Sequence, residues 1–234
     1  MERFWVLIPA AGAGRRMGAD RPKQYLRLAG RTVIEHTLDP FLDHPLVHGI
    51  VVVVDRPDTR WQELSVSRDS RVVTAGGGPE RCESVLNGLR RLAVQAAPRD
   101  WVLVHDAARP CLSRGDLDRL IAVLRDDPVG GILATPVRDT LKRGDERDRV
   151  LETLDRSHVW HALTPQMFHL GELTHALEHS LAQGAQVTDE ASAMEHMGAR
   201  PRLVTGRADN IKITHPEDLA VAELLLRRVQ GTTG

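Results

Sequence analysis

The sequence predicts a doubly wound α/β fold, in which a mostly parallel twisted sheet has helices on both faces. Five short runs rich in apolar and β-branched residues recur along the chain, at 4–9, 49–55, 71–75, 101–106 and 130–137. Each run is almost continuously apolar, which is typical of strands that are covered on both faces. Amphipathic stretches separate the runs, and this βαβ alternation indicates a parallel sheet.

Three of these stretches carry apolar residues at helical spacing, within 33–42, 85–93 and 117–124. Further along, Thr188 is predicted to cap a short helix that ends at Gly198. Thr214 and Glu217 fit a capping box for a last helix. We therefore expect the chain beyond about residue 158 to return to helices.

The segment 137–158 breaks the pattern. It is rich in charged residues, has one glycine near its middle and can pair with itself as an exposed hairpin. An extension of about 20 residues in a compact domain is usually functional or disordered. The residues therefore leave open both an arm that reaches a second subunit and a floppy loop. Otherwise the length predicts a single domain over residues 1–234, or at most two small ones.

Composition argues against several classes of protein. The 31 Lys and Arg residues nearly balance the 32 Asp and Glu residues, which argues against nucleic-acid or membrane-surface binding driven by bulk charge. Cys82 and Cys111 are too few for a disulfide framework and match no zinc spacing. No stretch approaches 18 consecutive apolar residues, and the chain opens directly into a strand. We therefore expect a cytoplasmic protein in which any anion site is a local cluster.

A glycine loop, PAAGAGRRM, follows the first apolar run. Gly12, Gly14 and Gly18 have the spacing GxGxxxG, and Met17 stands where a dinucleotide fingerprint has its third glycine. Asp55 could still serve as the ribose-binding acid of such a site. The GxxxxGK pattern of a P-loop is absent from the loop.

Cations distinguish this loop from both motifs. Arg15 and Arg16 follow Gly14 directly, and Lys23 comes seven residues after Arg16. Added to the N–H groups of a glycine turn, these charges suit a triphosphate or a transition state that gains negative charge. The alternative is a tight packing turn with solvated cations at its rim.

Further polar residues follow other predicted strands. A second glycine cluster, AGGGPERCESV, would open at the same sheet edge as the first, where ligands bind α/β folds. Asp106 can bind a ribose hydroxyl or help to hold Mg²⁺ through water, or it can simply pair with Arg109. His105 is expected to be structural. Lys212 alternates with two isoleucines and so points either into a cleft or into water.

Taken together and in order, these segments resemble the 2-C-methyl-D-erythritol 4-phosphate cytidylyltransferase family of the non-mevalonate isoprenoid pathway. The motifs are PAAGAGRRM, PKQY, GGPERCESV, WVLVHDAARP, PVRDT, WHALTPQ, TDEAS and GRADNIKIT, and the resemblance spans residues 5 to about 225. The first loop is shared with other nucleotidyltransferases, whereas HDAARP and TDEAS are more specific. The resemblance implies a Rossmann-like nucleotidyltransferase fold with a protruding β-arm at about 137–158, through which two subunits form a homodimer. It also implies Mg²⁺ and a reaction of CTP with the polyol phosphate that releases pyrophosphate.

The resemblance also implies roles for individual residues. Arg16 and Lys23 match the stabilisers of the transition state. Arg156 and Lys212 match the pair that positions the substrate phosphate, with Arg156 expected from the other subunit. Nucleotide contacts are expected at Ala10, Ala11, Gly12, Gly14, Arg15, Gly78, Ser84, Asp106 and Ala107, and substrate contacts at Arg109, Thr140 and Thr188. Mg²⁺ is expected mainly on the CTP phosphates, with Asp106 reaching it through water.

The implied reaction needs charge neutralisation rather than a general base. A phosphate monoester has a second pKa of about 6 and is therefore already close to a dianion at neutral pH. No obvious Ser, His and Asp set or carboxylate pair stands in the sequence. A ribitol 5-phosphate cytidylyltransferase and a catalytically silent nucleotide-binding module remain as alternatives.

Overall fold

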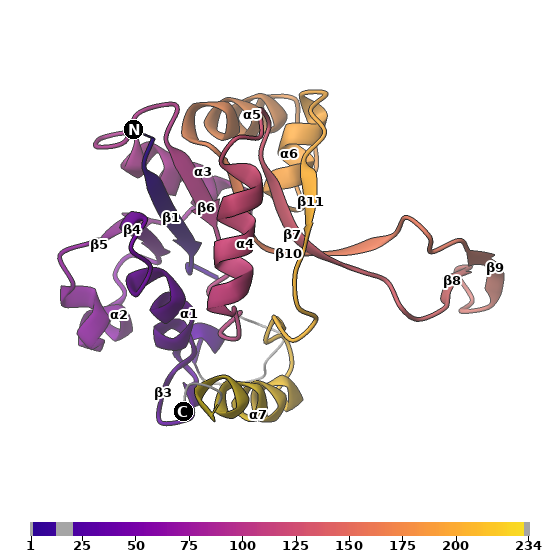
Figure 1. The fold of residues 1–234 in the computed structure, drawn as a ribbon, viewed down its shortest axis with the longest axis horizontal. Helices are drawn as coiled ribbons and strands as arrows, with labels where there is room; N and C mark the ends of the chain where they lie inside the picture. Colours follow the sequence, from indigo (N-terminus) through magenta and orange to yellow (C-terminus); the bar gives the residue numbers. More distant parts are fainter. Residues whose placement is uncertain (1, 13–20, 232–234) are drawn as a thin grey trace.

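A seven-stranded sheet forms the centre of the computed structural model, which describes residues 2–12 and 21–231 (Figure 1). The strand order is β11-β7-β10-β6-β1-β4-β5. Neighbouring strands are parallel except where β10 pairs with β6 and β7, so the sheet is mostly parallel, as predicted. The strands of this sheet are β1 (Phe4–Pro9), β4 (Val47–Val54), β5 (Val72–Gly76), β6 (Trp101–Val104), β7 (Gly131–Pro136), β10 (Trp160–His169) and β11 (Arg202–Thr205).

Helices cover both faces of the sheet (Figure 1). The α-helices are α1 (Val33–Leu42), α2 (Thr59–Glu63), α3 (Arg81–Leu92), α4 (Arg114–Leu124), α5 (Leu170–Ala182), α6 (Glu190–His196) and α7 (Glu217–Gly231). The described residues also form the short 3-10 helices η2 (Lys23–Tyr25) and η3 (Ser65–Arg68), and a small ribbon joins β2 (Arg27–Leu28) to β3 (Arg31–Thr32).

The first strand shows why a continuous apolar run suits this architecture. Val6 and Ile8 belong to the buried cluster that α1 and α4 complete, whereas Trp5 and Leu7 belong to the cluster on the α3 and α5 side. Successive side chains of a strand point to opposite faces, so both sets must be apolar when both faces are covered.

Two strands of the central sheet were not predicted, because the chain after residue 158 was expected to be helical. That expectation was wrong for β10 and β11. In β10 the sequence includes Pro165, and the pairing with β7 shifts register between Ala162 and Gln166. Because proline lacks an N–H donor, it is a poor signal for a central strand, and the irregularity accommodates it.

The predictions for the starts of α6 and α7 are each wrong by one residue, for the cap of α6 and for the acid that pairs with Thr214 at α7. Asp189, not Thr188, caps α6 by accepting a hydrogen bond from the Ser192 N–H at 2.9 Å. At α7 it is Asp218, rather than Glu217, that accepts from the hydroxyl and N–H of Thr214. In both places the acid one residue further along has the better reach to the free N–H groups.

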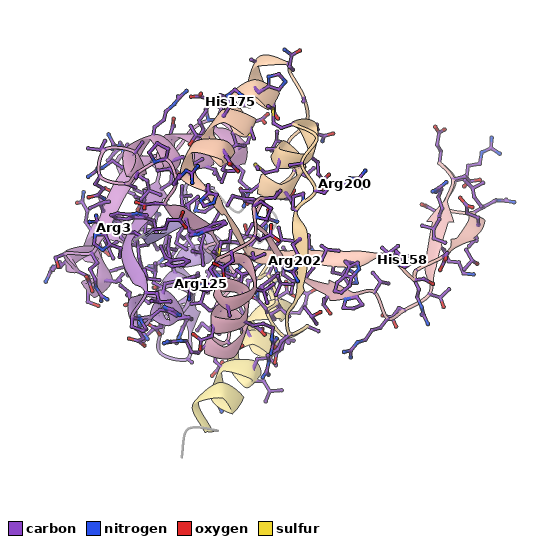
Figure 2. The ribbon with its side chains drawn as sticks, turned by 45° about the horizontal axis from the view of Figure 1, so that its top comes forward. Arg3, Arg125, His158, His175, Arg200 and Arg202 are labelled. Carbon is purple, nitrogen blue, oxygen red and sulfur yellow. The ribbon has the colours of Figure 1, made fainter. Side chains whose placement is uncertain are left out.

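The segment 137–158 is a hairpin that projects away from the sheet, as Figure 1 shows. Its strands β8 (Leu141–Gly144) and β9 (Val150–Leu154) pair only with each other. Figure 2 shows its side chains standing apart from the rest of the chain, with His158 at the neck. We call residues 137–158 the arm. No helix among the described residues is long and apolar enough to cross a membrane.

Candidate active site

A pocket opens where the loops after β1, β5 and β6 meet, at the carboxyl edge of the sheet. Its lining residues are Pro9, Ala10, Ala11, Gly12, Lys23, Gln24, Gly78, Pro79, Glu80, Arg81, Ser84, Asp106, Ala107, Ala108 and Lys212. Most of the residues expected to contact the nucleotide therefore share one cavity, together with two of the expected catalytic cations. Gly14, Arg15 and Arg16 lie outside the described residues.

The two glycine loops approach each other closely in this pocket. A Cβ on Gly77 would lie 2.3 Å from the Cβ of Ala11, so only glycine lets the two backbones come this near. The N–H of Gly78 donates to the hydroxyl of Ser84 at 3.0 Å. Ser84 thus holds the second loop in place from the first turns of α3.

Gln24, which was not predicted from the sequence, holds the start of the first glycine loop at Ala10 and Gly12. Its buried side-chain amide donates to the carbonyl of Ala10 at 2.6 Å and to that of Gly12 at 3.3 Å. The N–H of Ala10 in turn donates to Val53 on β4. A glutamine between a lysine and a tyrosine has no distinctive pattern, because its role depends on carbonyls that lie more than ten positions earlier.

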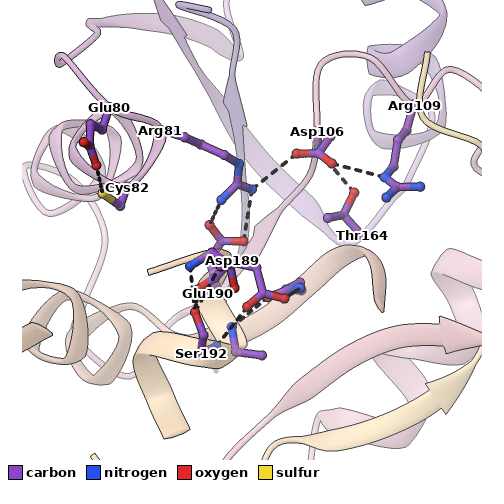
Figure 3. Close-up of polar contacts among 12 residues, drawn as sticks. Glu80, Arg81, Cys82, Asp106, Arg109, Thr164, Asp189, Glu190 and Ser192 are labelled. Carbon is purple, nitrogen blue, oxygen red and sulfur yellow. Dashed lines mark hydrogen bonds and ion pairs between the residues drawn. The ribbon is translucent and has the colours of Figure 1, made fainter. Parts of the chain in front are cut away.

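Asp106 is the centre of a charged cluster (Figure 3). Its Oδ2 lies 3.0 Å from Nζ of Lys212 and 3.1 Å from Nε of Arg109, and its Oδ1 lies 3.3 Å from Nη2 of Arg81. Burial by itself would raise the pKa of this carboxyl, but Arg81, Lys212 and Arg109 together hold it far below its usual range. Asp106 therefore stays ionised at any physiological pH. The salt bridge to Arg109, which was expected as the alternative to a ligand-binding role, is also present.

His105 supports Asp106 through the hydroxyl of Thr164 and the backbone of Arg109. Its Nε2 faces the carbonyl of Arg109 at 3.1 Å, so this nitrogen carries the proton and donates. Its Nδ1 then accepts from the hydroxyl of Thr164 at 2.8 Å, whose oxygen accepts from the N–H of Asp106 at 3.2 Å. Complete burial lowers the pKa of His105 to about 4. The neutral imidazole is a structural group, as expected.

Lys23 and Lys212 are linked through the segment that carries Lys212. The ammonium of Lys23 donates to the carbonyl of Ile213 at 2.9 Å, and the N–H of Ile213 donates to Ala108. The chain has no regular structure between β11 and α7, so the alternation around Lys212 reflects a loop. Ile213 is buried, while Lys212 lines the pocket. Of the two directions expected for the Lys212 side chain, into a cleft or into water, the structure shows the cleft.

Other predicted residues lie outside the pocket lining. Arg109 stands beside it, held by Asp106 and by the carbonyl of Asn210 at 2.7 Å. Thr188 is exposed just before α6. Thr140 and Arg156 are exposed on the arm, where Arg156 contacts the carbonyl of Arg138. The described structure therefore does not bring these two arm residues to the pocket of their own chain.

Asp55, the acid that a dinucleotide site would need, is not part of this pocket. It is exposed after β4 and lines a separate hollow with Trp61 and Arg91. Asp55 is therefore not placed to serve as the ribose-binding acid of a dinucleotide site in this pocket.

Sequence reasoning also missed an ion pair between Arg81 and Glu190. The guanidinium meets both oxygens of Glu190, at 2.7 and 3.2 Å, and Glu190 is 1% exposed (Figure 3). The two residues stand 109 positions apart. No local pattern could therefore pair them, although both were part of quoted motifs, GGPERCESV and TDEAS.

The described residues do not form a protein-only metal site. No cluster of three His, Cys, Asp or Glu side chains that could hold an ion occurs among them. Both oxygens of Asp106 are already engaged by cations.

Comparisons with known proteins agree on one family. Residues 4–228 match the family model described as 2-C-methyl-D-erythritol 4-phosphate cytidylyltransferase. A protein of that name from Ectopseudomonas mendocina (strain ymp) is 62% identical over 219 residues, which cover 93% of each chain. Among solved structures, 4-diphosphocytidyl-2C-methyl-D-erythritol synthase superposes with a TM-score of 0.84 at 41% identity, covering 97% of this chain and 99% of that one. The Francisella tularensis cytidylyltransferase gives 0.84 at 37% identity, covering 96% and 100%.

Proposed function

The chain belongs to the 2-C-methyl-D-erythritol 4-phosphate cytidylyltransferase family, and from this we infer that it transfers a cytidylyl group to 2-C-methyl-D-erythritol 4-phosphate. We propose CTP as the donor, with 4-diphosphocytidyl-2-C-methyl-D-erythritol and pyrophosphate as products. The observation that carries the proposal is the composition of the pocket. Two closely packed glycine loops and the cations Lys23, Arg81 and Lys212 line it.

The glycine loops suit the nucleotide. The loops after β1 and before α3 line the pocket at the sheet edge where phosphates bind α/β folds. Gln24 holds the carbonyls of Ala10 and Gly12, and Ser84 holds Gly78. Backbone that is fixed in this way before binding lowers the entropic cost of holding a flexible triphosphate.

The cations suit the chemistry. Attack of one phosphate on another brings two anions together, so alignment and charge neutralisation are the main requirements. Lys23 and Arg16 would stabilise the transition state, and Lys212 would position the phosphate of the polyol. Lys212 is bound to Asp106 in this structure. An incoming phosphate would therefore take over that ammonium while Asp106 keeps Arg81 and Arg109.

Mg²⁺ is proposed to enter with CTP. Bound to the triphosphate, it would neutralise charge on the leaving pyrophosphate. Asp106 would reach it only through water, since the carboxylate already accepts from three cations.

The arm is proposed to complete the site of a second subunit in a homodimer. A two-stranded hairpin is marginally stable alone, and this one exposes Val150 and Leu151 by 64% and 62%. Burial against another subunit would cover both. Thr140 and Arg156 would then reach the partner's pocket. We further propose a cytoplasmic enzyme that uses neither membranes nor nucleic acids.

The test is pyrophosphate release with CTP, UTP, ATP or GTP in the presence of 2-C-methyl-D-erythritol 4-phosphate or ribitol 5-phosphate. We expect rapid release only for CTP with the methylerythritol substrate. Faster release with ribitol 5-phosphate would favour that related activity. Nucleotide binding without release would make the chain a binding module instead.

A further inference from the structure

Arg81 joins two carboxylates that come from different parts of the fold. On one side it meets Glu190 in the first turn of α6, and on the other it meets Asp106 after β6 (Figure 3). The planar fork of a guanidinium can bind two carboxylates in a fixed geometry, which an ammonium cannot do. Arg81 therefore ties the start of α6 to Asp106.

Glu190 acts on the pocket indirectly. It is 1% exposed and is not among the residues that line the cavity, so its carboxylate is shielded from a ligand bound there. A carboxylate buried this deeply is costly unless it is paired. Its partner is Arg81, which does line the pocket.

The start of α6 is itself held firmly against the sheet. Gln166 on β10 is 1% exposed, accepts from the N–H of Ala191 at 2.8 Å and donates to Asp189 at 2.9 Å. Thr188, an expected substrate contact, directly precedes Asp189 and its N–H donates to Ser192. The position of Thr188 is therefore linked to that of Glu190.

We propose that Glu190 and Arg81 are positioning residues for the polyol phosphate, because they fix Asp106 and the segment around Thr188 relative to each other. This inference rests on the proposed function and assigns these two residues within it. Asp106 would keep its orientation through Arg81 after Lys212 has moved to the substrate phosphate. CTP, which is proposed to bind between the glycine loops, would depend much less on the pair, because Asp106 is only one of its expected contacts and would reach Mg²⁺ through water.

Positioning and simple electrostatics predict opposite results for Glu190→Gln. Loss of the buried negative charge makes the site more positive, so electrostatics alone would lower the KM of both anionic substrates. Loss of positioning would instead raise the KM of the polyol phosphate by about 10- to 100-fold, as for other displaced groups. The KM of CTP would stay within about twofold.

The experiment measures both KM values, kcat and Tm for the full chain and for Glu190→Gln. The matched control is Asp116→Asn, because Asp116 is also 1% exposed, pairs with an arginine (Arg119, at 3.0 Å) and lies in a first helical turn outside the pocket lining. We expect a lower Tm in both variants. Only Glu190→Gln should raise the KM of the polyol phosphate while the KM of CTP stays nearly constant. Equal changes in both KM values, or none, would overturn the proposal.

Arg81→Lys keeps the inference testable if Glu190→Gln does not fold. It preserves the charge but not the fork, so it should give the same selective rise in the KM of the polyol phosphate. In the double variant the two effects should not add, since each removes the same link. Additive effects would contradict a single positioning unit.

Direct binding separates this inference from the proposed function. Titration calorimetry of 2-C-methyl-D-erythritol 4-phosphate, in the presence of CTP with Ca²⁺ in place of Mg²⁺, reports the positioning effect without turnover. If the wild-type chain bound both compounds but released no pyrophosphate, the proposed activity would fail while the selective effect of Glu190→Gln would stand. Unchanged polyol phosphate affinity in that variant would refute the inference alone.

Discussion

The pocket and the arm are built on opposite principles. In the pocket, polar groups are buried and paired: Asp106 accepts from three cations, and His105 is fully enclosed. In the arm the polar groups are exposed, and the Arg143–Glu152 pair at 2.6 Å has side chains 61% and 50% exposed. Buried polar networks are expensive to disrupt, whereas exposed pairs contribute little. The difference shows that the polar groups of the pocket are fixed within the single chain, whereas those of the arm are open to solvent.

The largest expected effect is on the pocket side. Lys23→Ala should lower kcat by about 10²- to 10³-fold, or roughly 3 to 4 kcal/mol, because a group that stabilises developing charge is lost. CTP binding should be largely retained. Stopped-assay turnover and calorimetric CTP binding check this, with Lys23→Arg as the variant that keeps the charge. Turnover near that of wild type in Lys23→Ala would remove Lys23 from its proposed role.

Next in size is the pH dependence of stability that comes from His105. Its pKa is about 4 in the folded protein against an ordinary 6.5, so between these values the unfolded chain binds more protons. The free energy of unfolding therefore falls as the pH drops through this window, by about 2 kcal/mol between pH 7 and pH 5. Denaturant titrations of wild type and His105→Gln at both pH values should show this loss only in wild type. His158→Gln, at the neck of the arm, should behave like wild type.

A matched pair of glycines compares the two regions directly. Gly77→Ala would force a Cβ to within 2.3 Å of Ala11, so the two loops must separate. We expect the KM of CTP to rise by about tenfold, which corresponds to about 1.4 kcal/mol. At Gly144 in the arm a Cβ would lie 3.7 Å from the carbonyl of Arg149, an ordinary contact. Gly144→Ala should leave the KM of CTP unchanged, and an equal effect at both glycines would contradict the comparison.

The smallest expected difference is the one between a heterodimer and the wild-type dimer, and it tests whether the arm contributes to the site of the other subunit. Arg156→Ala and Lys23→Ala chains should each be inactive alone. A heterodimer of the two contains one intact site, so it should recover roughly half of the wild-type activity per dimer. Purified heterodimers with two different tags would be assayed for pyrophosphate release. If verified heterodimers stay inactive, Arg156 does not act across subunits.

Much of the pocket could be predicted because its parts are local in sequence. Glycines, cations and the carboxylate of Asp106 follow predicted strands, and the ends of these strands meet at one edge of a parallel sheet. This is where Gly78, Ser84, Asp106 and Lys23 lie. The arm could be recognised as a hairpin for the same reason, since a polar segment with a central glycine pairs with itself.

The residues that hold these groups in place could not be predicted. Gln24, Thr164 and Glu190 act through partners that lie elsewhere in the chain, and nothing in their neighbours marks them. The strand β10 was missed because it inserts antiparallel between β6 and β7 and contains Pro165. Its place depends on long-range pairing rather than on local propensity.

By itself the sequence determined the class of fold, the sheet edge at which the pocket opens, the glycine loops that line it and the family. These depend on periodicity and on motifs whose residues are close together along the chain. Only the tertiary structure decided that Lys212 faces Asp106, that Arg81 bridges Asp106 to Glu190 and that Arg156 stands away from its own pocket. Those relations depend on side chains that pack from separate elements, and chain folding alone brings them together.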